Sequence, residues 1–159
     1  MCRFKERGLT VKHKKIIVSE AKMGDFEEIV NLLYQLSPPR DGELIDNEKG
    51  QGILESMMKD PNYCLCVAKV ENEPVGTALL LIQLNLSHGG KSYGHVENVV
   101  TDIHFRGKGV GLAMINFLVS RAKERGCYKV ILDCETKNIP FYTRCGFNET
   151  GEVEMRLTP

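Results

Sequence analysis

Six consecutive residues, Arg106 to Gly111, combine three glycines with two cationic side chains in the order R-G-K-G-V-G. Glycines let a backbone approach a phosphate closely, and the first N–H groups of a following helix lack internal partners and point at a bound anion. Leu112 stands where a dinucleotide-binding loop has its third glycine, and Gly109 follows Lys108 where a Walker loop has Ser or Thr. The remaining pattern, R-x-x-G-x-G, predicts a pyrophosphate site. A glycine-rich turn without a ligand is the alternative.

Hydrophobic spacing places this loop between a strand and a helix of an α/β chain. Alternating or β-branched apolar runs predict strands, and apolar residues three and four apart predict helices. Asp25, three residues before Glu28, is typical of a helix start, and Gly126 is typical of a position just after a helix end. The predicted strands are 16–18, 63–70, 74–84, 93–102, 128–133 and a last one near 151–157. The predicted helices begin near residue 25, cover 46–59, follow the glycine-rich loop through 125 and cover 138–144, giving the order βααβββαβαβ.

Length and composition indicate one globular domain. The chain has 159 residues, 42% of them hydrophobic and 26% charged, which excludes a disordered tail protein, a coiled coil and a fibre. The net charge is zero, so no overall basic field favours nucleic acid. The longest apolar run, 78–82, is too short to span a bilayer. We predict a basic, mobile N-terminal arm at 1–15, without the apolar core of a secretory signal, and a single domain at 16–159.

Six cysteines are present, and no C-x-x-C motif occurs among them. A chain of this length has enough core to fold without disulfide bonds, and no histidine lies at zinc-finger spacing from a cysteine pair. We therefore expect reduced, packed thiols, no metal site and a cytoplasmic location.

The chain resembles the GNAT superfamily of acetyl-CoA-dependent N-acetyltransferases over residues 16–157. Arg106, Gly109 and Gly111 match its acyl-CoA signature R/Q-x-x-G-x-G/A. The later pattern of Asn138, Phe141, Tyr142, Gly146 and Phe147 also matches. The resemblance implies a mixed, mostly antiparallel sheet flanked by helices, with acetyl-CoA as co-substrate.

A closer resemblance is to glucosamine-6-phosphate N-acetyltransferases. The stretch 94–100 is similar to their G-H-I-E-D-I-V, and the stretch 126–134 is nearly identical to theirs. Two departures stand out: Asn98 replaces an acid, and Asn85-Leu86-Ser87-His88 replaces Lys-Phe-Ile-His. The resemblance implies that a small primary amine attacks acetyl-CoA directly in a ternary complex, with glucosamine 6-phosphate as the leading named acceptor.

The resemblance assigns catalytic roles to three residues. Glu97 would take the proton of the amine, directly or through water, Asp133 would orient the amine, and Tyr142 would donate a proton to the departing thiolate. The alternatives are a solvent-facing strand glutamate, a strand-end aspartate and a packed aromatic ring.

Cofactor contacts are expected from two regions. The backbone of Val99 and Val100 would meet the pantetheine arm and the thioester oxygen, as this strand does in the superfamily. The loop residues Arg106, Gly107, Lys108, Gly109, Val110 and Gly111 would hold the pyrophosphate. Asn138 would either hydrogen-bond the pantetheine or cap the short helix, and Tyr142 would meet the thioester sulfur.

Acceptor binding is expected from Glu97 and Asp133 together with three basic residues. His88 and His95 are candidates for contacts with a substrate phosphate, and solvated loop histidines are the alternative. Arg40 lies in a proline-containing loop that borders the acceptor site in this fold, where it would bind an anionic group.

Two other functions remain open on the sequence. A peptide N-acetyltransferase would keep the same chemistry on another acceptor, and a non-catalytic acetyl-CoA sensor would keep only the glycine-rich loop. The joint presence of Glu97 and Tyr142 argues for catalysis. The resemblance further implies a homodimer. The zero net charge and the short apolar runs lead us to expect no nucleic-acid and no membrane partner.

Overall fold

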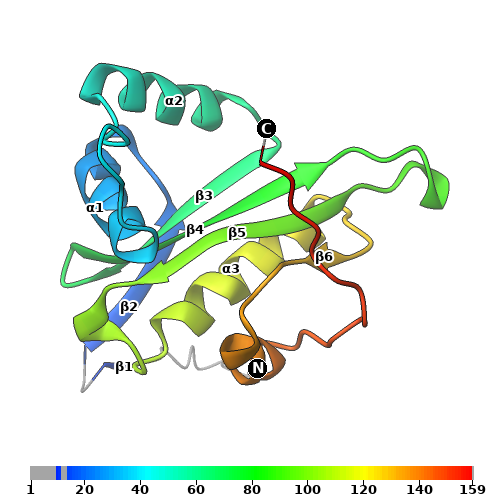
Figure 1. Ribbon diagram of the computed structural model, residues 1–159. Helices are drawn as coiled ribbons and strands as arrows, with labels where there is room; N and C mark the ends of the chain where they lie inside the picture. Colours follow the sequence, from blue (N-terminus) through cyan, green and yellow to red (C-terminus); the bar gives the residue numbers. More distant parts are fainter. Residues whose placement is uncertain (1–9, 12–13, 159) are drawn as a thin grey trace, which may run out of the picture.

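The computed structural model describes residues 10–11 and 14–158 (Figure 1). Its described strands form one sheet in the order β1-β2-β3-β4-β5-β6, antiparallel throughout except for the parallel pair of β5 and β6. The strands are β1 (Thr10–Val11), β2 (Lys14–Glu20), β3 (Tyr63–Val70), β4 (Glu73–Gln83), β5 (Tyr93–Thr101) and β6 (Val130–Ile131). This mixed, mostly antiparallel sheet confirms the predicted fold class.

Four α-helices and four short 3₁₀ turns connect these strands in the described part of the chain. The helices are α1 (Phe26–Leu36), α2 (Asn47–Lys59), α3 (Val110–Glu124) and α4 (Ile139–Arg144). The turns are η1 (Met23–Asp25), η2 (His88–Gly90), η3 (Ile103–Phe105) and η4 (Thr136–Asn138). Asp46 begins α2 by accepting a hydrogen bond from the Lys49 N–H at 3.0 Å, which satisfies one free donor of the first turn.

Helices cover both faces of the sheet. Cys66 and Val67 are neighbours in β3, so their side chains point to opposite faces. Cys66 packs in a cluster with Met114 of α3, whereas Val67 packs in a second cluster with Ile29 of α1. Figure 1 shows α1 and α2 on the side of the sheet away from α3.

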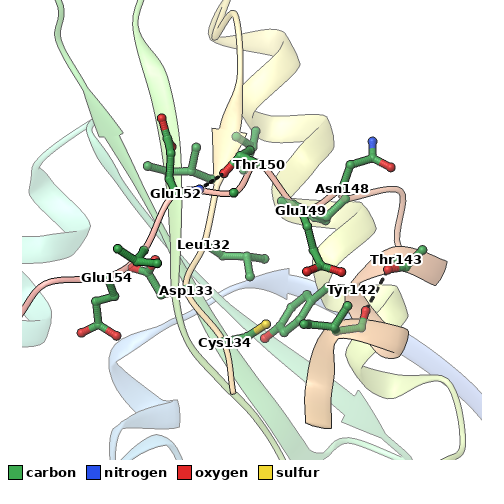
Figure 2. Close-up of a pocket in the computed structure, with 16 residues that line it drawn as sticks. Leu132, Asp133, Cys134, Tyr142, Thr143, Asn148, Glu149, Thr150, Glu152 and Glu154 are labelled. Atoms are coloured by element: carbon green, nitrogen blue, oxygen red, sulfur yellow. Dashed lines mark hydrogen bonds between the residues drawn. The ribbon is translucent and has the colours of Figure 1, made fainter. Parts of the chain in front are cut away.

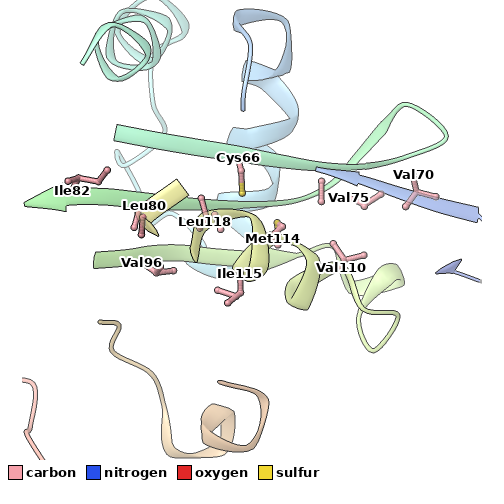
Figure 3. Close-up of a cluster of buried hydrophobic side chains, with 13 residues drawn as sticks. Cys66, Val70, Val75, Leu80, Ile82, Val96, Val110, Met114, Ile115 and Leu118 are labelled. Atoms are coloured by element: carbon pink, nitrogen blue, oxygen red, sulfur yellow. The ribbon is translucent and has the colours of Figure 1, made fainter. Parts of the chain in front are cut away.

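The larger core lies between α3 and the central strands (Figure 3). Leu80 of β4 is fully buried together with Met114, Ile115 and Leu118, which lie on one stripe of α3. Burying side chains of this size contributes about 1.5–3 kcal/mol each, so this stripe fixes the helix that follows the glycine-rich loop.

Several predicted boundaries are wrong. The first strand begins at Lys14 rather than residue 16, and it pairs with Thr10–Val11; residues 1–9 and 12–13 of the predicted arm lie outside the described residues. Asp25 does not cap α1, because its carboxylate accepts hydrogen bonds from the Lys22 N–H and from Lys69. The strand predicted over 128–133 is only two residues long.

The final strand predicted near 151–157 does not form. The segment Gly151–Thr158 has no regular structure, and Val153, Met155 and Leu157 are 78%, 88% and 89% exposed. An alternating apolar pattern becomes a strand only where a neighbouring strand completes its hydrogen bonds and covers its apolar face. Within the described residues this segment has no such neighbour.

Candidate active site

The glycine-rich loop leads from η3 directly into α3. Gly107 and Gly109 have φ values of 71° and 88°, in the left-handed region that favours glycine. The first helical hydrogen bond runs from the Ala113 N–H to the Gly109 carbonyl at 3.0 Å. The N–H groups of the preceding residues of this turn therefore have no partner inside the helix and are placed as a candidate anion site.

Both cations of the loop are held by backbone carbonyls of the segment that precedes it. The Nε of Arg106 donates a hydrogen bond to the Thr101 carbonyl at 3.2 Å. The Nζ of Lys108 donates to the His104 carbonyl at 2.6 Å and lies 4.9 Å from the centre of the Phe105 ring. Their charges remain exposed beside the start of α3, which strengthens the attraction for a phosphate.

A β-bulge interrupts β5 just before this loop. Leu79 of β4 pairs with Glu97 and Thr77 pairs with Val100, so two residues of β5 lie opposite one residue of β4. Asn98, inside the bulge, has a φ of 53°, a conformation that asparagine adopts more readily than most residues. A bulge leaves an extra residue unpaired, so it frees backbone groups beside Glu97.

β5 and β6 then separate. Among the described residues they pair at Gly94 with Val130 and at His95 with Ile131, and from Val96 onward the two chain segments are not joined. Figure 1 shows α4, drawn in orange, near the segment that follows β6, and the glycine-rich loop ahead of α3. The unpaired edges of β5 and of the segment after β6, here called the opening, leave backbone groups free to bond an extended ligand whose anionic end reaches the start of α3.

Three predicted residues come together at the closed end of this opening. The Nε2 atom of His95 lies 3.2 Å from Oε1 of Glu97 and 3.6 Å from Oδ2 of Asp133. His95 and Glu97 share a face of β5 because they are two residues apart, and Asp133 follows β6, which pairs with His95. The two carboxylates are about half exposed, so they remain accessible to a cationic acceptor.

Tyr142 of α4 lines the same cavity as Asp133 and Cys134, which follow β6. Its ring packs edge-on against Phe141 and Phe147, with centroid distances of 4.9 Å and 6.1 Å. Burial raises the pKa of its phenol to about 12, so the hydroxyl is protonated at neutral pH and can donate a proton. Figure 2 shows this phenol beside Cys134.

Cys134 is mostly exposed, and partial desolvation together with the nearby carboxylates Asp133 and Glu149 raises the pKa of its thiol. A raised thiol pKa disfavours the reactive thiolate. This environment agrees with a transfer that uses no cysteine nucleophile.

Three other predicted residues have different surroundings. Asn138 begins α4 but makes no side-chain cap, which excludes the capping alternative. His88 stacks on Tyr128 with ring centroids 4.2 Å apart, and its Nδ1 lies 2.9 Å from the Ser87 hydroxyl. Arg40 is exposed in the loop between α1 and α2. The structure therefore brings His95, but neither His88 nor Arg40, to the two carboxylates.

Sequence reasoning missed two features of this region. The first is Gln35 of α1, whose amide bonds to the turn before the glycine-rich loop, and no sequence signal indicated this pairing. The second is the contact of His95 with both carboxylates. The spacing H-x-E on a strand was the available signal, because it places both side chains on one face.

A family model described as the acetyltransferase (GNAT) family matches residues 26–147. The chain belongs to this family. Its members transfer an acetyl group from acetyl-CoA to amines, so the chain is an acetyl-CoA-dependent N-acetyltransferase. The resemblance predicted from the glycine-rich loop and the Asn138–Phe147 pattern is confirmed.

Named relatives of this GNAT domain share one description. The chain is 35% identical over 156 residues to a probable glucosamine 6-phosphate N-acetyltransferase 2 of Oryza sativa subsp. japonica, covering 96% of this chain and 90% of that one. It is 47% identical over 83 residues to a glucosamine 6-phosphate N-acetyltransferase of Trypanosoma brucei brucei, which is about half of each chain (52% and 56%). The crystal structure of the Arabidopsis thaliana glucosamine-6-phosphate N-acetyltransferase superposes with a TM-score of 0.83 at 28% identity, covering 91% of this chain and 98% of that chain.

The GNAT domain has the features that acetyl-CoA needs. The free N–H groups at the start of α3 and the two cations fit its pyrophosphate, and the separation of β5 from β6 fits an extended arm. Among the described side chains, no group of three or more His, Cys, Asp or Glu residues is arranged to hold a metal ion. No helix in the described ranges has the length and apolar character needed to cross a membrane.

Proposed function

We propose that this N-acetyltransferase acts on the amine of glucosamine 6-phosphate. The observation that carries the proposal is the pair of carboxylates, Glu97 and Asp133, on one side of the opening that leads to the glycine-rich loop. The similarity to relatives named for this substrate supports it. A primary ammonium is the group that two accessible carboxylates attract most directly.

In the proposed mechanism Glu97 removes a proton from the bound ammonium, because an ammonium group has no lone pair with which to attack. Asp133 accepts a hydrogen bond from the same amine and orients it. The two carboxylates act on one nitrogen because both lie within 3.6 Å of a common atom, Nε2 of His95. Direct proton removal and transfer through one water are both compatible with this placement.

The other half of the proposed site acts on the thioester. Backbone N–H groups at the bulge, around Val99 and Val100, stabilise the negative charge that develops on the carbonyl oxygen. Tyr142 donates its proton to the departing thiolate, which requires the neutral phenol that burial maintains. Asn138, at the start of the same short helix, binds the pantetheine amides.

The proposed pyrophosphate contacts are the backbone of Gly107, Gly109, Val110 and Gly111 and the side chains of Arg106 and Lys108. For the phosphate of the acceptor we propose Arg40, whose guanidinium is exposed, and His88, whose ring is held at the tip of the β4–β5 hairpin. Cytosolic location is part of the proposal, since the five described cysteines form no disulfide and reduced thiols persist in that compartment.

CoA release from acetyl-CoA tests the function. The acceptors are glucosamine 6-phosphate, glucosamine, a polyamine and a lysine peptide. Saturable release with the sugar phosphate at a kcat/KM well above the others is the expected result. Preferential release with another amine would replace the substrate assignment. Acetyl-CoA binding without release for any acceptor would favour the sensor.

Substitutions at two glutamates distinguish the loss of a general base from the mere loss of a negative charge. Glu97→Gln is expected to lower kcat about 10²-fold or more, as for loss of a general base. Glu73→Gln, on an exposed glutamate at the start of β4, is the matched control and is expected to keep the activity of the unchanged chain.

A homodimer completes the proposal. Val153, Met155 and Leu157 form an alternating row of exposed apolar residues in the sequence of a segment without regular structure, and a cavity of about 550 Å³ lies between this segment and Val130–Cys134 (Figure 2). A second copy would cover this row. Sedimentation should report a dimer that Met155→Glu converts to a monomer, whereas Leu86→Glu, at a fully exposed leucine elsewhere, should leave it intact. A monomeric unchanged chain would contradict this part of the proposal.

A further inference from the structure

Gly111 ends the glycine-rich loop, yet its backbone conformation does not require a glycine. It is the second residue of α3 and has a helical conformation, whereas Gly107 and Gly109 have positive φ values. Alanine is more favourable than glycine in a helix, and it would keep the N–H that the first turn leaves without an internal partner. The reason for a glycine at this position therefore lies in the space around its Cα.

The space beside Gly111 is filled by Phe141 of α4. A Cβ atom at Gly111 would lie 3.0 Å from Cζ and 3.3 Å from Cε2 of that ring, closer than the roughly 3.5–4.0 Å of favourable carbon contacts. At Gly107, by contrast, a Cβ would meet no atom within 4 Å. The side of Gly111 on which a side chain would stand is therefore turned toward α4 rather than toward open space.

Phe141 reaches Gly111 with the outer end of its ring. Cζ is the ring atom most distant from the α4 backbone, so the length of the ring sets how far α4 stands from the start of α3. The helix α4 has only six residues and is too short to be stable by itself, so packing contacts of this kind determine its position. A side chain at Gly111 would push the ring, and α4 with it, away from α3.

Tyr142 is the next residue of α4 and would follow that displacement. Its ring packs edge-on against Phe141 at a centroid distance of 4.9 Å, and its carbonyl accepts a hydrogen bond from the Phe147 N–H at 3.1 Å. Figure 2 shows its phenol beside Cys134 in the candidate site. The position of the phenol oxygen is therefore coupled to the contact between Phe141 and Gly111.

We propose that Gly111 is a positioning residue for the transfer step, because its missing side chain lets Phe141 seat α4 where the Tyr142 phenol meets the departing thiolate. This inference rests on the proposed function of Tyr142. It gives two glycines of one loop different tasks. Gly109 supplies the backbone turn that leads into the pyrophosphate site, whereas Gly111 leaves room for a neighbouring helix.

Gly111→Ala and Gly111→Val in the full-length chain test this role through the size of the added side chain. The Phe141 ring has to give way by a few tenths of an ångström for alanine and further for valine. A displacement of about 1 Å can cost about 10²-fold in rate. We therefore expect kcat to fall several-fold for Gly111→Ala and about 10²-fold for Gly111→Val, while calorimetry reports an acetyl-CoA Kd within about twofold of the unchanged chain.

Gly52 of α2 provides the matched control. It is helical and exposed, and a Cβ there would meet no atom within 4 Å, so Gly52→Ala and Gly52→Val make the same changes without a contact. Both variants should keep kcat and Kd. A rise in the acetyl-CoA Kd at Gly111 with an unchanged kcat at saturating acetyl-CoA would assign this glycine to ligand binding alone and overturn the proposal.

A double-mutant cycle identifies Phe141 as the residue that transmits the change. Phe141→Leu shortens the side chain, so by itself it seats α4 loosely and should lower kcat. Combined with Gly111→Val it makes room for the valine, so kcat of the double variant should exceed the product of the two single effects by about fivefold or more. The same cycle with Gly111→Ala replaces it if Gly111→Val does not fold. Effects that simply multiply would overturn the proposal.

A readout without turnover separates this inference from the proposed function. The NMR signals of the Tyr142 ring, identified by their loss in Tyr142→Phe, should shift in Gly111→Val but not in Gly52→Val, because the Phe141 ring beside them moves. Unshifted signals would overturn the inference even if glucosamine 6-phosphate is a good substrate. If another amine is the substrate, kcat is measured with that amine and the expectation is the same. Shifted signals in a chain that acetylates no amine would support the positioning contact and contradict the proposed function instead.

Discussion

Gln35 at the end of α1 is hydrogen-bonded to Asp102, 67 residues further along the chain, at the turn before the glycine-rich loop. The amide Nε2 of Gln35 donates to Oδ2 of Asp102 at 3.0 Å, and its Oε1 accepts from the Ile103 N–H at 3.2 Å. The bond to Gln35 holds the pKa of Asp102 below its ordinary value. One side chain thus joins the helix that precedes the Arg40 loop to the segment that positions the pyrophosphate site.

Gln35→Ala is therefore expected to weaken acetyl-CoA binding indirectly, through the turn that positions the glycine-rich loop. Loss of two exposed hydrogen bonds, worth about 1 kcal/mol together, predicts an increase of roughly fivefold in Kd. Calorimetric titration with acetyl-CoA measures it. Asn31→Ala, at an exposed position one turn earlier on α1, is the control and should leave Kd unchanged. Equal affinities for the two variants would show that the turn holds its shape without Gln35.

The depressed pKa of Asp102 also fixes the direction of a pH effect. A group whose pKa is lower in the folded state adds stability above its unfolded pKa and loses it as pH falls through the folded value. The stabilisation from the hydrogen bonds between Gln35 and the turn at Asp102 should therefore be fully present at neutral pH. The difference in thermal midpoint between the unchanged chain and Gln35→Ala should shrink only at strongly acidic pH, and a difference already gone at pH 6 would contradict it.

Gly109 and Gly126 flank α3 and allow a matched comparison. Both have positive φ, 88° and 71°, so alanine at either position strains the backbone by about 1 kcal/mol. Only Gly109 lies in the predicted pyrophosphate loop. We expect similar losses of thermal stability for Gly109→Ala and Gly126→Ala, but at least a tenfold increase in the acetyl-CoA Kd for Gly109→Ala alone. Equal Kd values would remove the loop from the binding site.

Local signals in the sequence predicted most of the elements. The glycine-rich loop, Asp46 before α2 and Gly126 after α3 each act on their own neighbours, and each has the predicted place. The strand pattern at 151–157 failed for the opposite reason. A strand needs a partner, and an alternating pattern carries no information on whether the partner belongs to the same chain.

The residues of the candidate site also fall into two groups, those that the sequence predicts and those whose contacts depend on packing between distant segments. Glu97 and His95 could be placed on one face from their spacing alone, and the resemblance supplied Asp133 and Tyr142. The clamp between Gln35 and Asp102 could not be predicted, because it joins two exposed polar residues far apart in the chain. The contact exists only because α1 and the end of β5 pack together in the folded state.

Tyr142 allows a test of acid catalysis. Tyr142→Phe keeps the ring that packs on Phe141 and Phe147 but removes the proton donor, so kcat should fall about 10–10²-fold with little change in acetyl-CoA Kd. Because burial raises the pKa of this phenol to about 12, the unchanged chain should lose no activity from its ionisation below about pH 11. Tyr63→Phe, a partly exposed tyrosine of β3, is the control.

We expect the free energy of unfolding to depend strongly on the buried ion pair between Asp25 and Lys69. Asp25 is almost completely buried and accepts hydrogen bonds from Lys69 and from the Lys22 N–H, so removing the cation leaves a desolvated carboxylate. Lys69→Met is expected to lower the free energy of unfolding by about 2 kcal/mol, less than for a fully buried pair because Lys69 is partly exposed. Urea denaturation provides the measurement.

Two further variants identify the cause of that loss. Adding Asp25→Asn to Lys69→Met removes the unpaired charge and should recover part of the stability, which a double-mutant cycle would report as a coupling energy between the two residues. Lys59→Met breaks an exposed ion pair with Glu55 on α2 and should change the stability little, because solvent and salt already screen those charges. A double variant no more stable than Lys69→Met would mean that the lysine acts through the packing of its aliphatic stem rather than through its charge.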